Sequence, residues 1–194
     1  MRSPSSQNSS IPAARSEEDG NVPFSDPDLK NIYLKMLDYL SSGDMAEQRL
    51  IDRVVRLRLR YPHAERYRNY TVENARKVLP ALRRDGYLDE ERYARHVLEK
   101  LKDKRDGLRS IQRKMLSRKI ERDLVTRLLQ EFEQTGEKQN LEKIIAAAQG
   151  KKERLIEKFG SHPKKKYQIR AKLYSWLAMR GYSSEESSEI LKKL

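Results

Sequence analysis

Apolar residues recur along most of the chain at the three- and four-residue spacing of an amphipathic helix, and no stretch alternates strongly at period two. From Tyr93 to Leu101, for example, apolar positions fall at i, i+4, i+5 and i+8, which places them on one face of a helix. Short joints of glycine, serine and aspartate separate such segments. The pattern predicts an all-α fold built from short helices.

The expected helices group into three sets of three. The first set, residues 28–87, has helices at about 28–41 and 45–60 and a third that begins after Thr71. The second set, residues 88–139, has a helix from Asp89 to about Lys104, one from Leu108 and one from about Glu121. The third set, residues 140–194, has a helix at about 141–159, one opened by Ser161 and Pro163, and a short last helix. Residues 1–27 are rich in Ser, Pro and Asn and predict a disordered tail.

Residues typical of helix ends mark several joints. Gly86 and Gly181 suit the left-handed position just past a helix, and Asp28 and Asp89 can cap the helices that follow them. Ser183 and Glu186 have the spacing of a capping box. Two residues are unfavourable inside the helices in which they are expected. Pro80 predicts a kink or an early end of the third helix, and Gly150 destabilises the helix at 141–159 by about 1 kcal/mol relative to alanine. Joints are also expected at 41–44, 106–107 and 136–140.

The sets carry faint internal similarity. The apolar residues at 32, 36, 37 and 40 stand 61 positions before those at 93, 97, 98 and 101. Those at 115, 120, 128 and 129 stand 62 positions before 177, 182, 190 and 191. Any two amphipathic helices can be aligned in this way, but the shared glycine-tyrosine joints favour a repeat, and stacked repeats are elongated and curved.

Composition limits the possible functions. Hydrophobic and charged residues each make up 37% of the 194-residue chain, which favours several thin modules over one large core. The net charge of +13 attracts polyanions, of which nucleic acid is the commonest. The chain has no cysteine, so disulfides and cysteine-based metal sites are excluded. It shows no membrane-spanning run and no signal peptide, so we expect a soluble, cytoplasmic protein.

No pattern specifies an active site. The histidines His63, His96 and His162 are isolated, and no phosphate-cradling glycine loop is present. Acidic residues stand at helix starts or among basic ones, as helix-face pairs do. A nuclease built from scattered carboxylates stays possible in principle, but a noncatalytic binding protein without metal or cofactor is the better interpretation.

Basic residues concentrate at 49–60, 100–119 and 164–172, where they can neutralise phosphates. The interleaved residues Tyr67, Tyr70 and Tyr167 could stack on unpaired bases, or could lie in the core or at its rim. Tyr174 is interpreted as a core or rim residue and Trp176 as a core residue. Trios of short helices also allow a helix-turn-helix reader of duplex DNA, although no helix carries the usual base-reading side chains. Three tandem units favour a long binding surface instead.

The run Gly-Tyr-Leu-Asp-Glu-Glu-Arg-Tyr-Ala at 86–94 resembles the signature of the RecX family of recombination regulators, with Glu90 in place of the family's second Asp and Tyr93 in place of Phe. Residues 115–120 resemble the family's Leu-x-x-Lys-Gly-Ile, with Lys119 where glycine is usual. Residues 173–182 resemble its C-terminal Leu-x-Arg-Arg-Gly-Phe. The first set matches less well, since residues 42–46 depart from the family pattern and residues 61–70 look like an insertion.

The resemblance implies three tandem three-helix modules in an elongated, curved, right-handed or solenoid-like array. It also implies binding to the RecA recombinase, chiefly in the groove of its filament on single-stranded DNA, and restraint of filament growth, strand exchange and ATP hydrolysis without catalysis. Weaker electrostatic contact with single- or double-stranded DNA is expected as well. The basic residues near the matched motifs are the candidate contacts: Arg92, Arg95, Arg113, Lys114, Arg118, Lys119, Arg170, Lys172 and Arg180. The residues expected to shape the fold are Gly86, Tyr87, Leu88, Asp89, Tyr93, Ala94, Trp176, Gly181 and Tyr182.

Two other functions compete with this one. The chain could be a DNA-binding protein in its own right, with strongly salt-dependent affinity. It could also be a helical adaptor for an acidic protein. An enzyme ranks last, because no catalytic constellation is visible.

Overall fold

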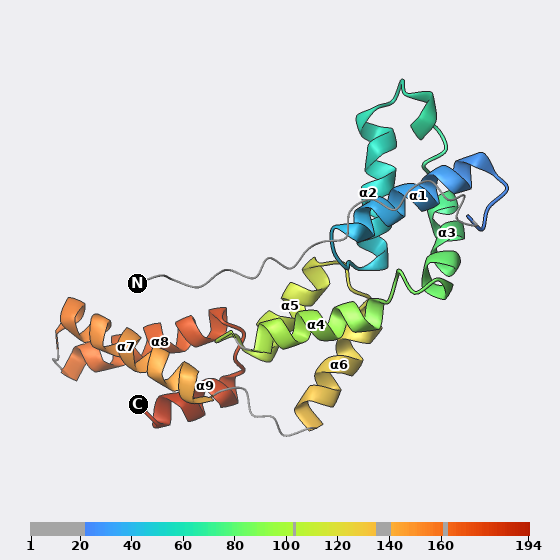
Figure 1. Cartoon of the computed structure of the whole chain (residues 1–194). Helices are drawn as coiled ribbons and strands as arrows, with labels where there is room; N and C mark the ends of the chain where they lie inside the picture. The colour runs from blue at the N-terminus through green and yellow to red at the C-terminus, as the bar shows by residue number, and fades with distance from the viewer. Residues whose placement is uncertain (1–21, 103, 135–140, 161–162) are drawn as a thin grey trace, which may run out of the picture.

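The computed structural model describes residues 22–102, 104–134, 141–160 and 163–194, and across these ranges it contains nine α-helices, one short 3-10 helix and no strand (Figure 1). The all-α prediction is therefore confirmed. The expected joint at 136–140, the tail before residue 22, Ser161 and His162 lie outside the described residues.

The first triplet consists of α1 (Pro27–Ser41), α2 (Glu47–Arg60) and α3 (Val72–Arg84), with the 3-10 helix η1 (Glu65–Tyr67) between the last two. Its core gathers one apolar stripe from each helix; Ile32, Met36, Leu50 and Leu82 are fully buried. Each stripe alone would face water, so the three helices are stable only when they pack together.

The second triplet consists of α4 (Glu90–Lys102), α5 (Leu108–Ser117) and α6 (Arg122–Gln134). Its fully buried side chains include Leu101, Ile111, Met115 and Leu128. Ala46, which precedes α2, is buried in this second core and not in the first. The two triplets therefore share apolar packing at their boundary.

The third triplet consists of α7 (Leu141–Phe159), α8 (Pro163–Met179) and α9 (Ser184–Lys192). It holds two small clusters, one around Ile144, Leu177 and Ile190 and one around Leu155, Ile169 and Leu173. Leu191 and Leu194 pack against both clusters. Helix α7 runs unbroken through Gly150, so the penalty of that glycine does not interrupt it.

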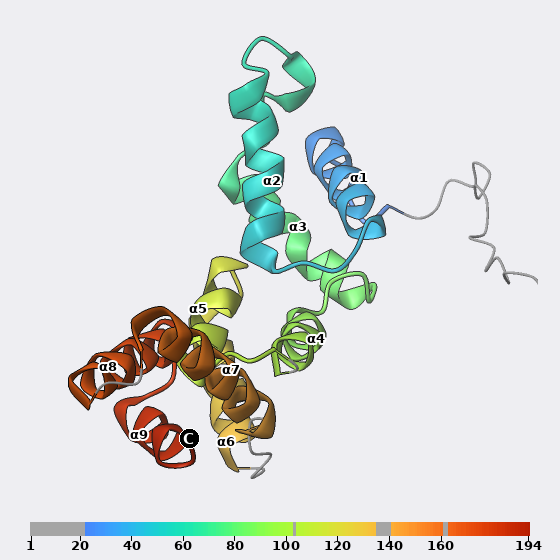
Figure 2. The same ribbon diagram turned by 90° about the vertical axis from the view of Figure 1, so that its left-hand side faces the viewer.

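The triplets follow one another in a bent row (Figures 1 and 2). The first lies at one end of the molecule, the second in the middle and the third at the other end. Three tandem triplets agree with the expected architecture. The solenoid-like curvature and the independence of the three units stay predictions.

Several helix ends confirm the expected caps. The Thr71 hydroxyl accepts from the Asn74 N–H at 3.2 Å, and the Asp89 carboxylate accepts from the Arg92 N–H at 2.8 Å. The Ser183–Glu186 capping box is complete, with bonds of 3.1 and 2.6 Å. These side chains satisfy backbone N–H groups that the first helical turn leaves free.

Other boundaries differ from the prediction. Asp26, not Asp28, caps α1, because Pro27 already occupies the first helical turn. Residues 22–26 are not a free tail: Val22 and Phe24 pack on the first core, with the Phe24 ring 5.8 Å from that of Tyr33.

Pro80 does not end α3, which continues to Arg84. Pro80 is exposed, so the carbonyl that loses its N–H partner lies on the solvent side of the helix. Helix α4 ends at Lys102, two residues before its expected end.

The loop between α2 and α3 is held together by tyrosines. The Tyr67 ring lies 5.7 Å from Tyr61 and 5.1 Å from Tyr70. Tyr70 is buried and its hydroxyl donates to the Asn31 carbonyl at 3.3 Å, so the prediction that Tyr70 could stack on a base is wrong. Tyr167 is 80% exposed and stays available.

At one pair of positions, the internal sequence similarity extends to the backbone conformation. Lys119 follows α5 and Gly181 follows α8, 62 positions later, and their φ angles are +67° and +88°. Lys119 thus adopts the left-handed conformation at the position where the family pattern has glycine. A side chain in that conformation costs about 1–2 kcal/mol.

We therefore expect Lys119→Gly to stabilise the protein by about 1 kcal/mol, since the relief of left-handed strain outweighs the extra freedom of glycine in the unfolded chain. Urea unfolding followed by circular dichroism measures the change. Lys100→Gly, in the right-handed last turn of α4, is the control and should destabilise by about 0.5–1 kcal/mol. An equal loss of stability in both variants would contradict the expectation.

Candidate functional site

The motif at 86–94 forms the joint between the first two triplets. Gly86 has φ of +75°, and the N–H groups of Tyr87 and Leu88 both donate to the Leu82 carbonyl, at 3.0 and 3.1 Å. This reversal buries Leu88 in the first core and leaves the Tyr87 side chain 50% exposed. Tyr93 and Ala94 are buried in the second core. The motif therefore forms the turn between the first two triplets and contributes side chains to both of their cores.

Glu90 links three helices at this joint. Its carboxylate accepts from the N–H of Glu47, the first residue of α2, at 3.2 Å, and from the N–H of Glu121, just before α6, at 3.0 Å. Burial raises the pKa of Glu90, and the two backbone bonds oppose that shift only in part. In the sequence, Glu90 stands out only as the residue in place of the second Asp of the RecX signature. Its bridging role was missed, because both partners are distant in the chain.

An open groove runs beside this bridge between the first and second triplets. Its basic side chains are Arg76, Arg83, Lys119 and Arg122, and its acidic ones are Glu47, Glu90 and Glu121. Arg83 makes a two-pronged ion pair with Glu47, which holds α3 against the start of α2. Lys119 is the one candidate contact that lines this groove.

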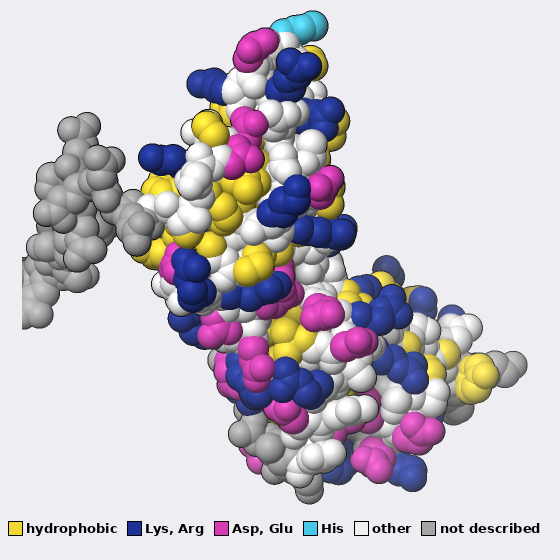
Figure 3. Space-filling model, turned by 90° about the vertical axis from the view of Figure 1, so that its right-hand side faces the viewer, with side chains coloured by type: hydrophobic (Ala, Val, Ile, Leu, Met, Phe, Trp, Pro, Cys, Tyr) yellow, Lys and Arg dark blue, Asp and Glu magenta, His cyan; other side chains and the backbone are white. Residues whose placement is uncertain are grey.

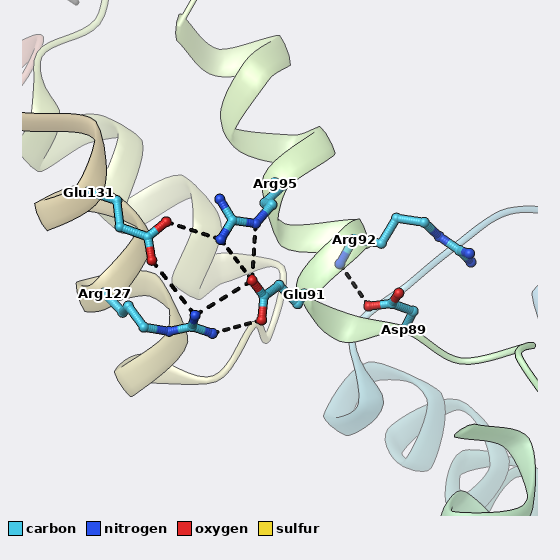
Figure 4. Close-up of polar contacts among 6 residues, drawn as sticks. All are labelled: Asp89, Glu91, Arg92, Arg95, Arg127 and Glu131. Atoms are coloured by element: carbon cyan, nitrogen blue, oxygen red, sulfur yellow. Dashed lines mark hydrogen bonds and ion pairs between the residues drawn. The ribbon is translucent and has the colours of Figure 1, made fainter. Parts of the chain in front are cut away.

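The candidate Arg95 on α4 belongs to a network of ion pairs with α6 (Figure 4). Arg95 contacts Glu91 at 2.7 Å and Glu131 at 3.0 Å, and Arg127 contacts Glu91 at 2.9 Å. The guanidinium groups of Arg127 and Arg95 lower the pKa of Glu91 to about 2, and Arg127 has the larger effect. The network ties α4 to α6, so it stabilises the second triplet and leaves Arg95 less free to bind a partner.

Arg92 points away from that network (Figure 4). It lies 3.5 Å from Asp44, in the joint between α1 and α2. Lys114 pairs with Asp106, and Arg118 donates to the Lys114 carbonyl at 2.8 Å. Arg113 is exposed and has no ion-pair partner in the part of the chain that the structure describes. Of the candidates on α5, Arg113 is thus the most available.

The second and third triplets meet through backbone. The Gly107 N–H donates to the Arg180 carbonyl at 2.8 Å, and Arg180 Nη1 donates to the Arg105 carbonyl at 3.1 Å. A Cβ on Gly107 would lie 2.5 Å from the Gly181 carbonyl, and one on Gly181 would lie 2.3 Å from the Ser110 nitrogen. Only glycine fits at either position. The family-like Arg180-Gly181-Tyr182 run therefore builds this joint.

Tyr182 and Trp176 complete the joint. Tyr182 is buried, and burial, with the nearby carboxylates of Glu186 and Asp106, raises its pKa to about 12. Trp176 is half-buried against the third core and carries the Arg180 guanidinium 4.6 Å above its ring. Trp176 is thus less buried than a core residue.

The nine candidate cations do not form one patch. On α8, Lys172 lines a groove shared with α7, whereas Arg170 lines a pocket on the opposite face together with Lys152 and Lys166. On the face shown in Figure 3, Lys and Arg side chains alternate with Asp and Glu. That the nine candidate cations contact a partner stays a prediction.

The described residues contain no group of three or more His, Asp or Glu side chains placed to hold a metal ion. No helix within the described ranges is long and apolar enough to span a membrane.

No family model and no curated protein sequence matches the chain. Solved structures do. The crystal structure of RecX from Lactobacillus salivarius superposes with a TM-score of 0.62 at 14% identity, over 86% of this chain and 96% of that one. A second crystal structure, of the regulatory protein RecX, gives a TM-score of 0.61 at 18% identity, over 85% and 72% of the two chains. The chain has the fold of RecX.

Proposed function

We propose that the chain is a noncatalytic regulator that binds the RecA recombinase filament and restrains its growth, strand exchange and ATP hydrolysis. The observation that carries the proposal is likeness to RecX over most of the chain, from the first triplet to the last. The motif residues support it, because Gly86, Asp89 and Gly181 occupy the structural positions that shape the joints.

The bent row of triplets suits such a role. Two contacts hold neighbouring triplets together: the Glu90 carboxylate accepts from the N–H groups of Glu47 and Glu121, and the Gly107 N–H donates to the Arg180 carbonyl. A row fixed in this way can contact successive subunits of a filament with little loss of conformational freedom on binding. The +13 charge favours association with a filament that carries DNA. A protein with this function would act in the cytoplasm.

Cosedimentation tests the binding step. Preformed RecA filaments on single-stranded DNA are pelleted with increasing amounts of the full chain, in parallel with the same DNA without RecA, at physiological salt. We expect the chain to pellet with the filaments to a saturating ratio and much less with bare DNA. Pelleting with bare DNA alone would contradict the proposal and favour the stand-alone DNA-binding function.

A further inference from the structure

Helices α7 and α8 form an open groove with an unusual lining. Its cations are Lys151, Arg154, Lys158 and Lys172, and no carboxylate lines it. Two aromatic rings, Phe159 and Trp176, and the 78% exposed side chain of Met179 complete the wall. In contrast to the groove between the first two triplets, this one presents a single sign of charge.

The cations of the groove are not used by the fold. Within the described ranges, none of the four makes an ion pair with a carboxylate; Arg154 donates only to the Gly150 carbonyl, at 3.1 Å. Lys158 and Lys172 instead lie over the Phe159 ring, at 5.8 and 5.3 Å from its centre. Because these four side chains have no carboxylate partner, they are available to an anionic ligand. Four cations along one groove match a ligand with several negative charges, that is, a polyanion.

The aromatic rings narrow the class of polyanion. Phe159 and Trp176 are only half-buried and border the same groove as the cations. Unpaired bases stack on such rings while Lys and Arg follow the phosphates, whereas a duplex hides its base faces and an acidic protein surface has no bases to stack. In the free protein Arg180 lies over the Trp176 ring, and Lys158 and Lys172 lie over the Phe159 ring. We propose that this groove binds single-stranded nucleic acid, with one or two bases replacing these cations on the rings of Trp176 and Phe159 while the four groove cations turn to the phosphates.

Trp176 makes the proposal directly measurable, because it is the only tryptophan of the chain. A deoxythymidine oligonucleotide is expected to quench its fluorescence, and an abasic oligonucleotide of equal length and charge is expected not to. Trp176→Leu should weaken binding of a labelled deoxythymidine oligonucleotide by about 5- to 150-fold, the range measured for loss of one stacked base. Equal quenching by both oligonucleotides, or none by either, would overturn the proposal.

A pair of charge variants tests the groove without altering the tryptophan. Lys158→Gln with Lys172→Gln removes two groove cations, and Lys152→Gln with Lys166→Gln removes two from the pocket on the opposite face. The groove variant should reduce the slope of log affinity against log salt by about 1.4, at about 0.7 per phosphate contact. The opposite-face variant should leave the slope and the quenching nearly unchanged. Equal reductions of the salt slope in the two variants would overturn the proposal that this groove is the binding site.

A polyglutamate competitor separates the remaining alternative. If polyglutamate displaces the oligonucleotide from the groove at equal charge concentration, the groove is a general acidic-partner site and the proposal fails. Urea unfolding of each variant shows whether it folds; if Trp176→Leu does not, the abasic comparison and the charge variants still decide. All these measurements use the chain and oligonucleotides without RecA, so the site can fail or hold independently of the recombinase proposal.

Discussion

Gly107→Ala is expected to loosen the third triplet from the second. The φ of Gly107 is −73°, which alanine adopts freely, so the effect isolates the close approach of the two backbones. The new Cβ would stand 2.5 Å from the Gly181 carbonyl and 2.6 Å from the Tyr182 nitrogen, and neither backbone group can rotate away. Overpacking of this kind costs about 1–3 kcal/mol. Gly181→Ala should cost more, because its φ of +88° adds strain.

Urea unfolding measures the loss, and hydrogen exchange locates it. The N–H of residue 107 donates to the Arg180 carbonyl, so its protection should fall in the alanine variant while amides in the core of α4 stay protected. Gly150→Ala is the matched control: its Cβ would meet nothing closer than 4.0 Å, and it should stabilise α7 by about 0.5–1 kcal/mol. Unchanged stability and unchanged protection in Gly107→Ala would show that the joint is not close-packed.

Glu90→Ala is expected to weaken the joint between the first and second triplets. The change leaves the N–H groups of Glu47 and Glu121 without their carboxylate, at the starts of two helices from different triplets. A part-buried donor without a partner costs about 1–3 kcal/mol. Glu90→Gln should lie between, because its amide oxygen can accept from one N–H while its amide nitrogen faces the other.

The pH dependence gives a second readout for Glu90. Burial holds its folded pKa above the unfolded value of 4.5, so the stabilisation from this side chain is fully present below pH 4.5 and decreases as the pH rises through the folded pKa. The difference between wild type and Glu90→Ala should therefore be larger at pH 4.5 than at pH 7. Glu73→Gln, which breaks only an exposed pair with Lys77, is the control and should change stability by less than about 0.5 kcal/mol. An effect of Glu90→Ala no larger than the control would contradict the bridge.

The helices and most of their caps could be predicted from sequence because their causes are local. The spacing of apolar residues set the nine segments, and Thr71, Asp89 and Ser183 each cap an N–H group three residues away. The error at α1 was small for the same reason: Asp26 and Asp28 both offer a carboxylate, and only the position of Pro27 decides between them.

The contacts between the triplets and the lining of the groove could not be predicted, because they depend on residues that are distant in the chain. The Glu90 bridge spans 43 and 31 positions, and the Gly107–Gly181 contact joins two triplets. Among the groove residues, sequence named Lys172 as a candidate contact and Trp176 only as a residue that shapes the fold, and it assigned no binding role to Phe159. The charge of Arg95 gave no sign that two carboxylates would hold it. The partner itself was suggested only by the family resemblance.

The most direct test of the proposed function is DNA-dependent ATP hydrolysis by the RecA protein of the same organism, with the full chain titrated from far below one molecule per RecA. We expect hydrolysis to be suppressed at substoichiometric amounts, as filament binding or capping requires, and suppression to weaken in Gly107→Ala. Unchanged hydrolysis at a full equivalent of a chain that still binds bare DNA would limit the likeness to RecX to the fold and leave stand-alone DNA binding as its function.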